Sequence, residues 1–269
     1  MKINFLLIIF FCYNIIIAKE LDSLYYFKNN IKYKDKSFYD SQYKEQKCVL
    51  DIALPKLIKN FQTIIWFQGG GLTGGEKYYE KELLNGKNCI VSVGYRLYPN
   101  ANINEILDDA AAAVKYIHDN INKYGGNKNK IILSGHSAGG YITLMIGMDS
   151  SYLSRYNLTP QNLKMLIPLS PQTITHFTIR KFKGIPEGQI IVDSLAPMYY
   201  VNRKHPPIHL ICGDKEMELF GRFEESQYFI KMLKFNGNEN SYLYELQGFD
   251  HGDMVAPGCL LINKIIEKM

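Results

Sequence analysis

Short apolar runs alternate with helical patterns along most of this chain. The runs that predict strands span residues 48–54, 63–67, 89–93, 131–133, 165–169, 208–212 and 241–246. Apolar residues at helical spacing predict helices over residues 103–121, 141–148, 223–235 and 260–266. Several of these strands are continuously apolar, which is typical of strands covered on both faces. The pattern therefore predicts an α/β fold with a mostly parallel central sheet and helices on both faces.

Two segments depart from this alternation. Residues 24–47 are rich in Tyr and Lys and are expected to form an exposed lead-in. Residues 172–207 are irregular, with several Pro and Gly residues, and we expect them to form a small cap that decides the substrate. We find no internal repeat and no interdomain linker, so residues 19–269 are expected to form a single domain.

The first residues have the pattern of an export signal. Lys2 provides a positive start, residues 3–17 are almost wholly apolar, and Ala18 is a small residue suited to cleavage. We therefore expect residues 1–18 to be a signal peptide and the protein to be secreted or periplasmic. The alternative is a membrane anchor formed by residues 3–17, although this run is short for a span. No later stretch is apolar enough to suggest stable membrane insertion.

Composition narrows the class of protein further. The chain has 269 residues, of which 46% are hydrophobic and 21% charged, so it can bury a large core. Its net charge is +5, but the basic residues are scattered rather than clustered. We therefore expect no nucleic-acid partner. The oligomeric state is open.

The cysteines give no sign of a metal site. Four follow the signal segment, and neither a C-x-x-C pair nor any other zinc-ligand spacing is present. Export would permit a disulfide, but the sequence leaves the pairing open. We expect no metal and no cofactor. The four cysteines are Cys48, Cys89, Cys212 and Cys259.

The strongest chemical motif is Gly135-His136-Ser137-Ala138-Gly139, between a predicted strand and a predicted helix. This is the G-x-S-x-G pattern in the strand–turn–helix context of a nucleophile elbow. Ser137 is expected to sit at strained backbone angles, with Gly135 and Gly139 allowing strand and helix to pack closely. The hydroxyl of Ser137 would then project beside the positive end of a helix.

A nucleophilic serine needs a base, and that base needs a carboxylate to orient it. The expected chain order for such an elbow is Ser, then an acid, then His. Ser137, Asp214 and His251 satisfy this order, and the last two follow predicted strands. Parallel strands would place all three at one edge of the sheet. Glu216 and Glu218 are the nearby alternatives for the acid, and Asp193 is a distant one.

The developing oxyanion needs preorganised N–H donors. We expect one from Ala138, directly after the nucleophile. The others should come from Gly70 and Gly71, in the glycine-rich turn that follows the strand over residues 63–67. Within the cap segment, His176, Phe177 and Arg180 are candidate substrate contacts.

Taken together, these motifs resemble the α/β-hydrolase superfamily, near the hormone-sensitive-lipase-like carboxylesterases. The resemblance runs from about residue 63 to the C-terminus. Gln68 stands where that family usually has His, and the segment before the glycine turn is too short for a large N-terminal cap. The motifs that carry the resemblance are Gln68-Gly69-Gly70-Gly71, Gly94-Tyr95-Arg96-Leu97-Tyr98-Pro99, Gly135-His136-Ser137-Ala138-Gly139-Gly140, Gly213-Asp214 and Asp250-His251-Gly252.

The resemblance implies a serine esterase that works through an acyl-enzyme, with short acyl groups on carbohydrates as the expected substrates. That substrate class rests on analogy alone. A peptidase or an amidase such as a formamidase would use the same triad. A non-catalytic binding protein on the same scaffold is a third reading, disfavoured because the Ser and the His are both present.

Overall fold

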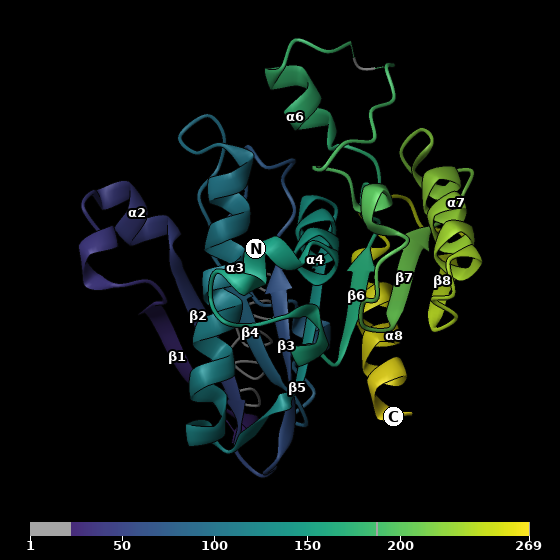
Figure 1. Cartoon of the computed structure of the whole chain (residues 1–269). Coiled ribbons are helices and arrows are strands. Elements are labelled where there is room, and N and C mark those ends of the chain that lie inside the picture. Colours follow the sequence, from purple (N-terminus) through teal and green to yellow (C-terminus); the bar gives the residue numbers. More distant parts are fainter. Residues whose placement is uncertain (1–22, 187, 269) are drawn as a thin grey trace, which may run out of the picture.

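The computed structural model describes residues 23–186 and 188–268, which form an α/β architecture around one eight-stranded sheet (Figure 1). The strand order is β1-β2-β4-β3-β5-β6-β7-β8. β1, β2 and β4 pair antiparallel, whereas every neighbouring pair from β4 to β8 is parallel. The strands are β1 Tyr25–Lys32, β2 Val49–Pro55, β3 Phe61–Phe67, β4 Cys89–Val93, β5 Gly126–His136, β6 Met165–Leu169, β7 Ile208–Gly213 and β8 Ser241–Leu246.

Helices cover both faces of the sheet because successive strand residues point to opposite sides. In β3, Ile65 and Phe67 pack in the core under α3, α4 and α7, while Ile64 and Trp66 pack in a second core under α8. The expected α/β-hydrolase fold is therefore confirmed. The α-helices are α2 Gln42–Lys47, α3 Ile103–Asn120, α4 Ala138–Met148, α5 Ser150–Ser154, α6 Phe177–Phe182, α7 Arg222–Phe235 and α8 Val255–Glu267.

The exposure expected for residues 24–47 is found, but the segment is a structured part of the domain rather than a lead-in. Most of it is ordered as β1 and α2, separated by a short 3-10 helix at Lys36–Phe38. The polar run in β1 hid the strand, because β1 lies at the edge of the sheet and only its first residue, Tyr25, is buried. Its ladder with β2 is what holds this segment to the sheet.

The irregular segment over residues 172–207 lies between β6 and β7. It contains α6 and a 3-10 helix, Pro197–Tyr200, and α6 stands above the carboxyl ends of the strands (Figure 1). The four cysteines of the described residues are buried free thiols, so none of them pairs. No helix within residues 23–186 and 188–268 has the length and apolar character needed to cross a bilayer. The proposed signal segment lies outside the described residues.

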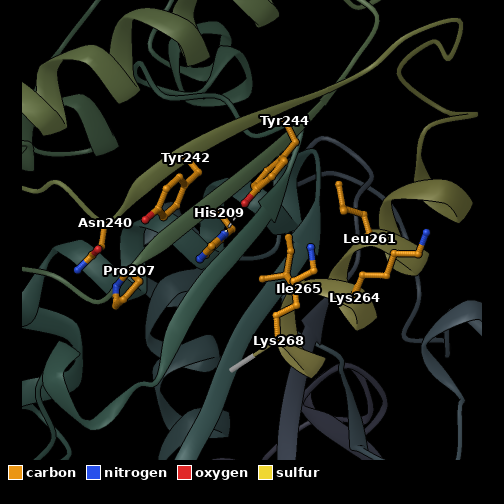
Figure 2. A pocket seen from close by; sticks show the side chains of 9 residues that line it. All are labelled: Pro207, His209, Asn240, Tyr242, Tyr244, Leu261, Lys264, Ile265 and Lys268. Carbon is orange, nitrogen blue, oxygen red and sulfur yellow. Dashed lines mark hydrogen bonds between the residues drawn. The ribbon is translucent and has the colours of Figure 1, made fainter.

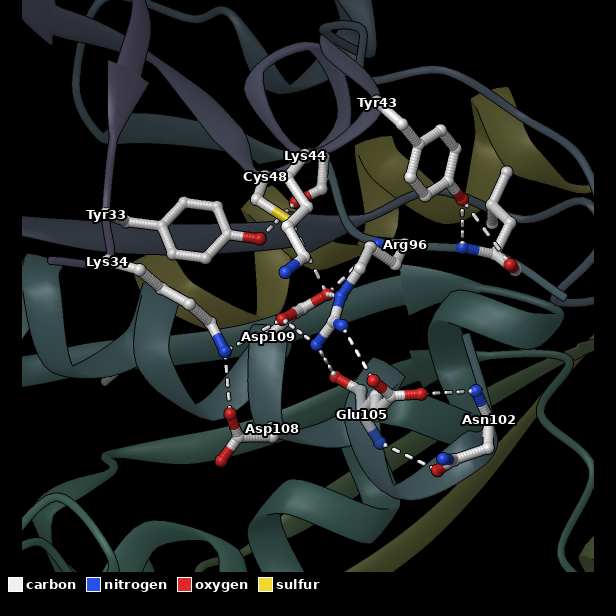
Figure 3. Close-up of polar contacts among 12 residues, drawn as sticks. Tyr33, Lys34, Tyr43, Lys44, Cys48, Arg96, Asn102, Glu105, Asp108 and Asp109 are labelled. Carbon is white, nitrogen blue, oxygen red and sulfur yellow. Dashed lines mark hydrogen bonds and ion pairs between the residues drawn. The ribbon is translucent and has the colours of Figure 1, made fainter. Parts of the chain in front are cut away.

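A buried ion network holds the loop that follows β4 (Figure 3). Arg96 Nε and Nη2 donate to the two carboxylate oxygens of Asp109 at 2.8 and 2.9 Å, and Asp109 has no exposed side-chain surface. Lys34 Nζ lies 2.8 Å from the same carboxylate. Paired and hydrogen-bonded charges of this kind are tolerated inside a protein, whereas removing one partner is costly. The network therefore fixes the loop after β4 against α3.

Candidate active site

Ser137 occupies the turn between β5 and α4 at φ 55° and ψ −114°. A non-glycine residue at positive φ is uncommon and strained, and such residues cluster at functional sites. The turn is held by Ser137 N–H, which donates to the carbonyl of Leu169 in β6 at 2.9 Å. Ser137 itself remains half-buried at the carboxyl edge of the sheet. The strained elbow predicted by the motif is present.

The glycines flanking this turn allow a close approach that no other residue would permit. A Cβ on Gly139 would lie 1.9 Å from the carbonyl oxygen of Phe67, and one on Gly135 would lie 2.5 Å from the same oxygen. These contacts are far below van der Waals distance and involve backbone, which cannot move aside. The end of β3 therefore packs directly against the elbow.

His251 lies beside the elbow, in the loop between β8 and α8. The ring of His136, next to Ser137 in the chain, lies 4.6 Å from the ring of His251, and its Nε2 is 2.8 Å from the His251 carbonyl oxygen. Burial, with the nearby His251, lowers the pKa of His136 to about 4. His136 is therefore neutral and donates this hydrogen bond.

The carboxylate that contacts His251 belongs to Glu218, not to Asp214. His251 Nδ1 lies 2.5 Å from Glu218 Oε1, and only 1% of the Glu218 side chain is exposed. Burial opposes ionisation of Glu218, but hydrogen bonds from His251 and the backbone N–H of Leu219 outweigh it and lower its pKa to about 2. Glu218 is therefore ionised, so His251 carries its proton on Nδ1 and leaves Nε2 with a lone pair.

Ser170, a residue that the sequence motifs did not single out, completes this contact. Its hydroxyl donates to Glu218 Oε2 at 2.7 Å and lies 2.9 Å from His251 Nδ1. Ser170 has φ 42°, and its carbonyl accepts a 2.6 Å hydrogen bond from Arg222 Nη1. No sequence motif indicates these contacts of Ser170, and its positive φ angle cannot be read from the sequence.

The expected contact between Asp214 and His251 is absent from the described structure. Asp214 accepts instead from the backbone N–H groups of Gly248 at 2.7 Å and Glu216 at 2.9 Å, which lower its pKa. The next residues form a turn, closed by the hydrogen bond from Glu218 N–H to the Asp214 carbonyl, which places Glu218 beside His251. Asp214 therefore joins the loop of Glu218 to the loop that leads to His251. Among the expectations drawn from the sequence, Glu218 was an alternative to Asp214.

The glycine-rich turn after β3 lies next to the elbow. A Cβ on Gly69 would be 3.6 Å from the Cβ of Ser137. Gly70 and Gly71 have φ 109° and 62°, and the structure assigns their N–H groups no hydrogen-bond partner among the described residues. Ala138 opens α4, where a helix leaves its first N–H groups without intrahelical partners. The two glycine N–H groups therefore belong to a turn that reaches Ser137 at Gly69, and Ala138 N–H directly follows the serine.

The loop after β4 supports this glycine turn. Tyr95 Oη donates to the Gln68 carbonyl at 2.7 Å, and Tyr98 N–H donates to the Leu72 carbonyl at 2.9 Å. Tyr95 and Tyr98 belong to the same loop as Arg96, which is held by its ion pair with Asp109. The motif at residues 94–99 therefore acts by holding the backbone of the glycine turn.

The cap segment reaches the same turn through α6. Thr178 Oγ1 donates to the Gly71 carbonyl at 2.5 Å, and a Cβ on Gly71 would lie 3.2 Å from the Phe177 ring. His176 is buried and stacks against Phe177, with ring centres 4.4 Å apart. Its Nδ1 accepts from Thr178 N–H at 3.2 Å, and burial holds its pKa well below the usual value. His176 is thus neutral, with its proton on Nε2.

Arg180 forms its hydrogen bonds within the cap segment. Its Nε donates to the Thr175 carbonyl at 3.1 Å and its Nη1 to the Gln189 carbonyl at 2.6 Å. The guanidinium is therefore used to hold the backbone of the cap segment together. Among the described residues, no cluster of three or more His, Cys, Asp or Glu side chains could hold a metal ion.

Comparisons with known proteins indicate the same class of fold. Residues 50–166 match the family model BD-FAE, an α/β-hydrolase esterase family. The chain is 31% identical over 132 residues to an AB hydrolase superfamily protein of Schizosaccharomyces pombe, covering 46% of this chain and 38% of that protein. The family model covers less than half of the chain, and it agrees with the α/β-hydrolase fold described above.

Two further proteins extend this likeness across most of the chain. A probable isoprenylcysteine alpha-carbonyl methylesterase of Arabidopsis thaliana is 28% identical over 239 residues, covering 76% of this chain and 48% of that protein. The chain thus spans less than half the length of both curated relatives. A truncated carbohydrate esterase from gut microbiota superposes with a TM-score of 0.74 at 18% identity, covering 92% of this chain and 97% of that one, which shows the shared fold.

Proposed function

We propose that this protein is a serine carboxylesterase that cleaves its substrate through an acyl-enzyme. The observation that carries the proposal is the 2.5 Å contact between His251 Nδ1 and the buried carboxylate of Glu218, next to the strained Ser137 turn. A histidine oriented by a carboxylate beside a half-buried, strained serine is the arrangement that activates a hydroxyl. The match to an esterase family model supports the same reaction class.

In the proposed reaction, Ser137 Oγ attacks the ester carbonyl while His251 Nε2 takes its proton. The N–H groups of Gly70, Gly71 and Ala138 stabilise the oxyanion that forms. His251 then returns the proton to the departing alcohol, which leaves Ser137 acylated. Water, deprotonated by His251, attacks the acyl-enzyme and releases the acid. Glu218 stays ionised throughout and stabilises the imidazolium, and no cofactor is required.

Ser170 would act as a positioning residue in this scheme. Its hydroxyl holds the second oxygen of the Glu218 carboxylate, so the first oxygen stays aligned with His251 Nδ1. The hydrogen bond from Thr178 to Gly71 plays a comparable part on the other side, because it couples the cap to the oxyanion donors.

The substrates that we propose are esters of short acyl groups, with carbohydrate-borne acyl groups as the narrower class. The cap is small, with α6 as its one α-helix among the described residues, and leaves little structure to enclose a long lipid chain. The neutral His176, with Nε2–H as a donor, and the ring of Phe177 are the proposed substrate contacts. The carbohydrate esterase of similar fold is consistent with this class. We propose export from the cytoplasm on the basis of Lys2 and residues 3–17.

The test is hydrolysis of p-nitrophenyl acetate and p-nitrophenyl butyrate by the wild-type protein and by Ser137→Ala. Removal of the nucleophile is expected to lower kcat by roughly 10⁴-fold or more. The p-nitroanilides of the same acyl groups provide the matched comparison for amidase activity. Wild-type activity that survives in Ser137→Ala would refute the assigned nucleophile, and a preference for the anilides would refute the esterase assignment.

A further inference from the structure

A second pocket lies at the opposite end of β7 and β8 from the proposed active site. It has a volume of about 420 Å³ and is bordered by Pro207 and His209 at the start of β7 and by Asn240 just before β8. Ser137, Glu218 and His251, by contrast, lie at or beyond the carboxyl ends of strands. The pocket is therefore separate from the catalytic groups, and none of them lines it.

One wall of this pocket is a strip of aromatic rings on the sheet. His209 pairs with Tyr242 in the β7–β8 register, so their side chains emerge on the same face as that of Tyr244, two residues further along β8. The His209 ring lies 4.8 Å from that of Tyr242 at 25° and 5.9 Å from that of Tyr244 at 12°. The three rings are thus stacked with nearly parallel planes, and together they form one largely apolar wall.

The opposite wall is one stripe of α8 and its last turn (Figure 2). Leu261, Lys264, Ile265 and Lys268 follow the i, i+3, i+4, i+7 spacing that places side chains on one helix face. Leu261 and Ile265 are apolar, whereas the two lysines are four residues apart. Like charges at this spacing repel each other.

Lys264 and Lys268 give the pocket a positive charge, and no acidic residue among those that line it balances this charge. No acidic side chain is among the nine lining residues, and no described residue forms an ion pair with Lys264 or Lys268. Glu267, the acid next to Lys268, is paired with Lys87 at 2.6 Å. A third cation, Lys234 Nζ, lies 5.8 Å from the centre of the Tyr242 ring.

The ring of His209 adds a directed donor rather than another charge. Its Nδ1 lies 3.0 Å from Tyr244 Oη, and burial lowers the pKa of His209. Burial also raises the pKa of Tyr244, so its hydroxyl keeps a proton to donate to Nδ1. The neutral ring then carries its own proton on Nε2, for which the described residues provide no partner.

We propose that this pocket is a second binding site, which takes a planar aromatic ring bearing one carboxylate. The ring lies against the strip of Tyr242, His209 and Tyr244, and the carboxylate faces Lys264 and Lys268. Apolar walls with a few convergent polar groups are the usual composition of small-molecule sites. A bound anion also relieves the repulsion between the two lysines, which a neutral ligand of the same shape does not.

The probe is 2-naphthoate, with 2-naphthamide as its neutral match, titrated by calorimetry into the full protein. Binding of the carboxylate with a Kd of about 1 mM or tighter is expected. The amide should bind roughly tenfold more weakly, and Lys264→Gln/Lys268→Gln should weaken the carboxylate by about the same factor. Lys231→Gln, an exposed lysine on α7 that does not line the pocket, is the matched control and should bind as the wild type does.

Three outcomes would overturn the proposal: no saturable binding of 2-naphthoate, equal binding of the amide, or unchanged binding by the double variant. Repeating the titration after reaction with diethyl 4-nitrophenyl phosphate separates this site from the catalytic one. Carboxylate binding that persists in the labelled protein belongs to the second pocket. Failure of Ser137 to react would count against the esterase proposal and would leave the lysine comparison intact.

Discussion

The turn after β5 and the loop after β7 both deliver a chemical group to the same edge of the sheet, but they fix it by different means. Ser137 is fixed by backbone packing, because Gly135 and Gly139 bring β3 against the elbow at distances that exclude any Cβ. Glu218 is fixed by hydrogen bonds to its carboxylate, from Ser170 and from His251. The first arrangement is steric, and the second is made by polar contacts between segments distant in the chain.

The Ser137 turn therefore tolerates no added side-chain volume at its glycines. The Glu218 loop instead depends on the charge of its carboxylate. A methyl group is enough to disrupt the elbow, whereas in the acid loop the same fold can be kept while the anion is removed. Substitutions in the two regions should therefore have different consequences, with folding affected in one and catalysis in the other.

The largest effect is expected from Glu218→Gln, which keeps the shape of the side chain and removes its charge. Without the anion, His251 loses the partner that sets its tautomer, and we expect kcat on p-nitrophenyl acetate to fall roughly 10³- to 10⁴-fold. Asp214→Asn is the matched control, since the Asp214 carboxylate accepts from the backbone N–H groups of Gly248 and Glu216 and does not contact His251. It should change kcat by less than about fivefold. A greater loss in Asp214→Asn than in Glu218→Gln would restore Asp214 as the acid.

The second effect concerns folding. Gly139→Ala would place a Cβ 1.9 Å from the Phe67 carbonyl oxygen, so we expect the free energy of unfolding to fall by about 3 kcal/mol or more. Gly188→Ala is the control, because no heavy atom lies within 4 Å of its added Cβ. Urea unfolding of both variants measures the difference. Equal stability of the two variants would contradict the steric account of the elbow.

The same distinction explains how much could be predicted from the sequence. Continuous apolar runs indicate parallel strands, so the central sheet was predictable from the sequence. The two glycines around Ser137 indicate the elbow, so its position was predictable as well. β1 was missed because its ladder with β2, rather than an apolar run, holds it in place. Sequence order favoured Asp214, four residues before the carboxylate that contacts His251, because the turn from Asp214 to Glu218 has no apolar pattern that would reveal it. The position of Ser170 beside Glu218 could not be predicted from the sequence, since its positive φ angle belongs to the folded backbone and has no motif of its own.

The smallest effect is a pH dependence of stability that arises from Glu218. Its pKa in the folded protein is about 2, below the ordinary 4.5, so its ionised form stabilises the fold above about pH 4.5. This contribution is lost as the pH falls through 4.5 towards 2. We expect the unfolding free energy of the wild type to drop about 1–2 kcal/mol more than that of Glu218→Gln between pH 6 and pH 3, after allowance for screening by solvent. Urea titrations at the two pH values measure this, and Asp214→Asn should retain the wild-type drop from Glu218. Parallel losses in the wild type and Glu218→Gln would show that the contact with His251 does not hold the carboxylate ionised.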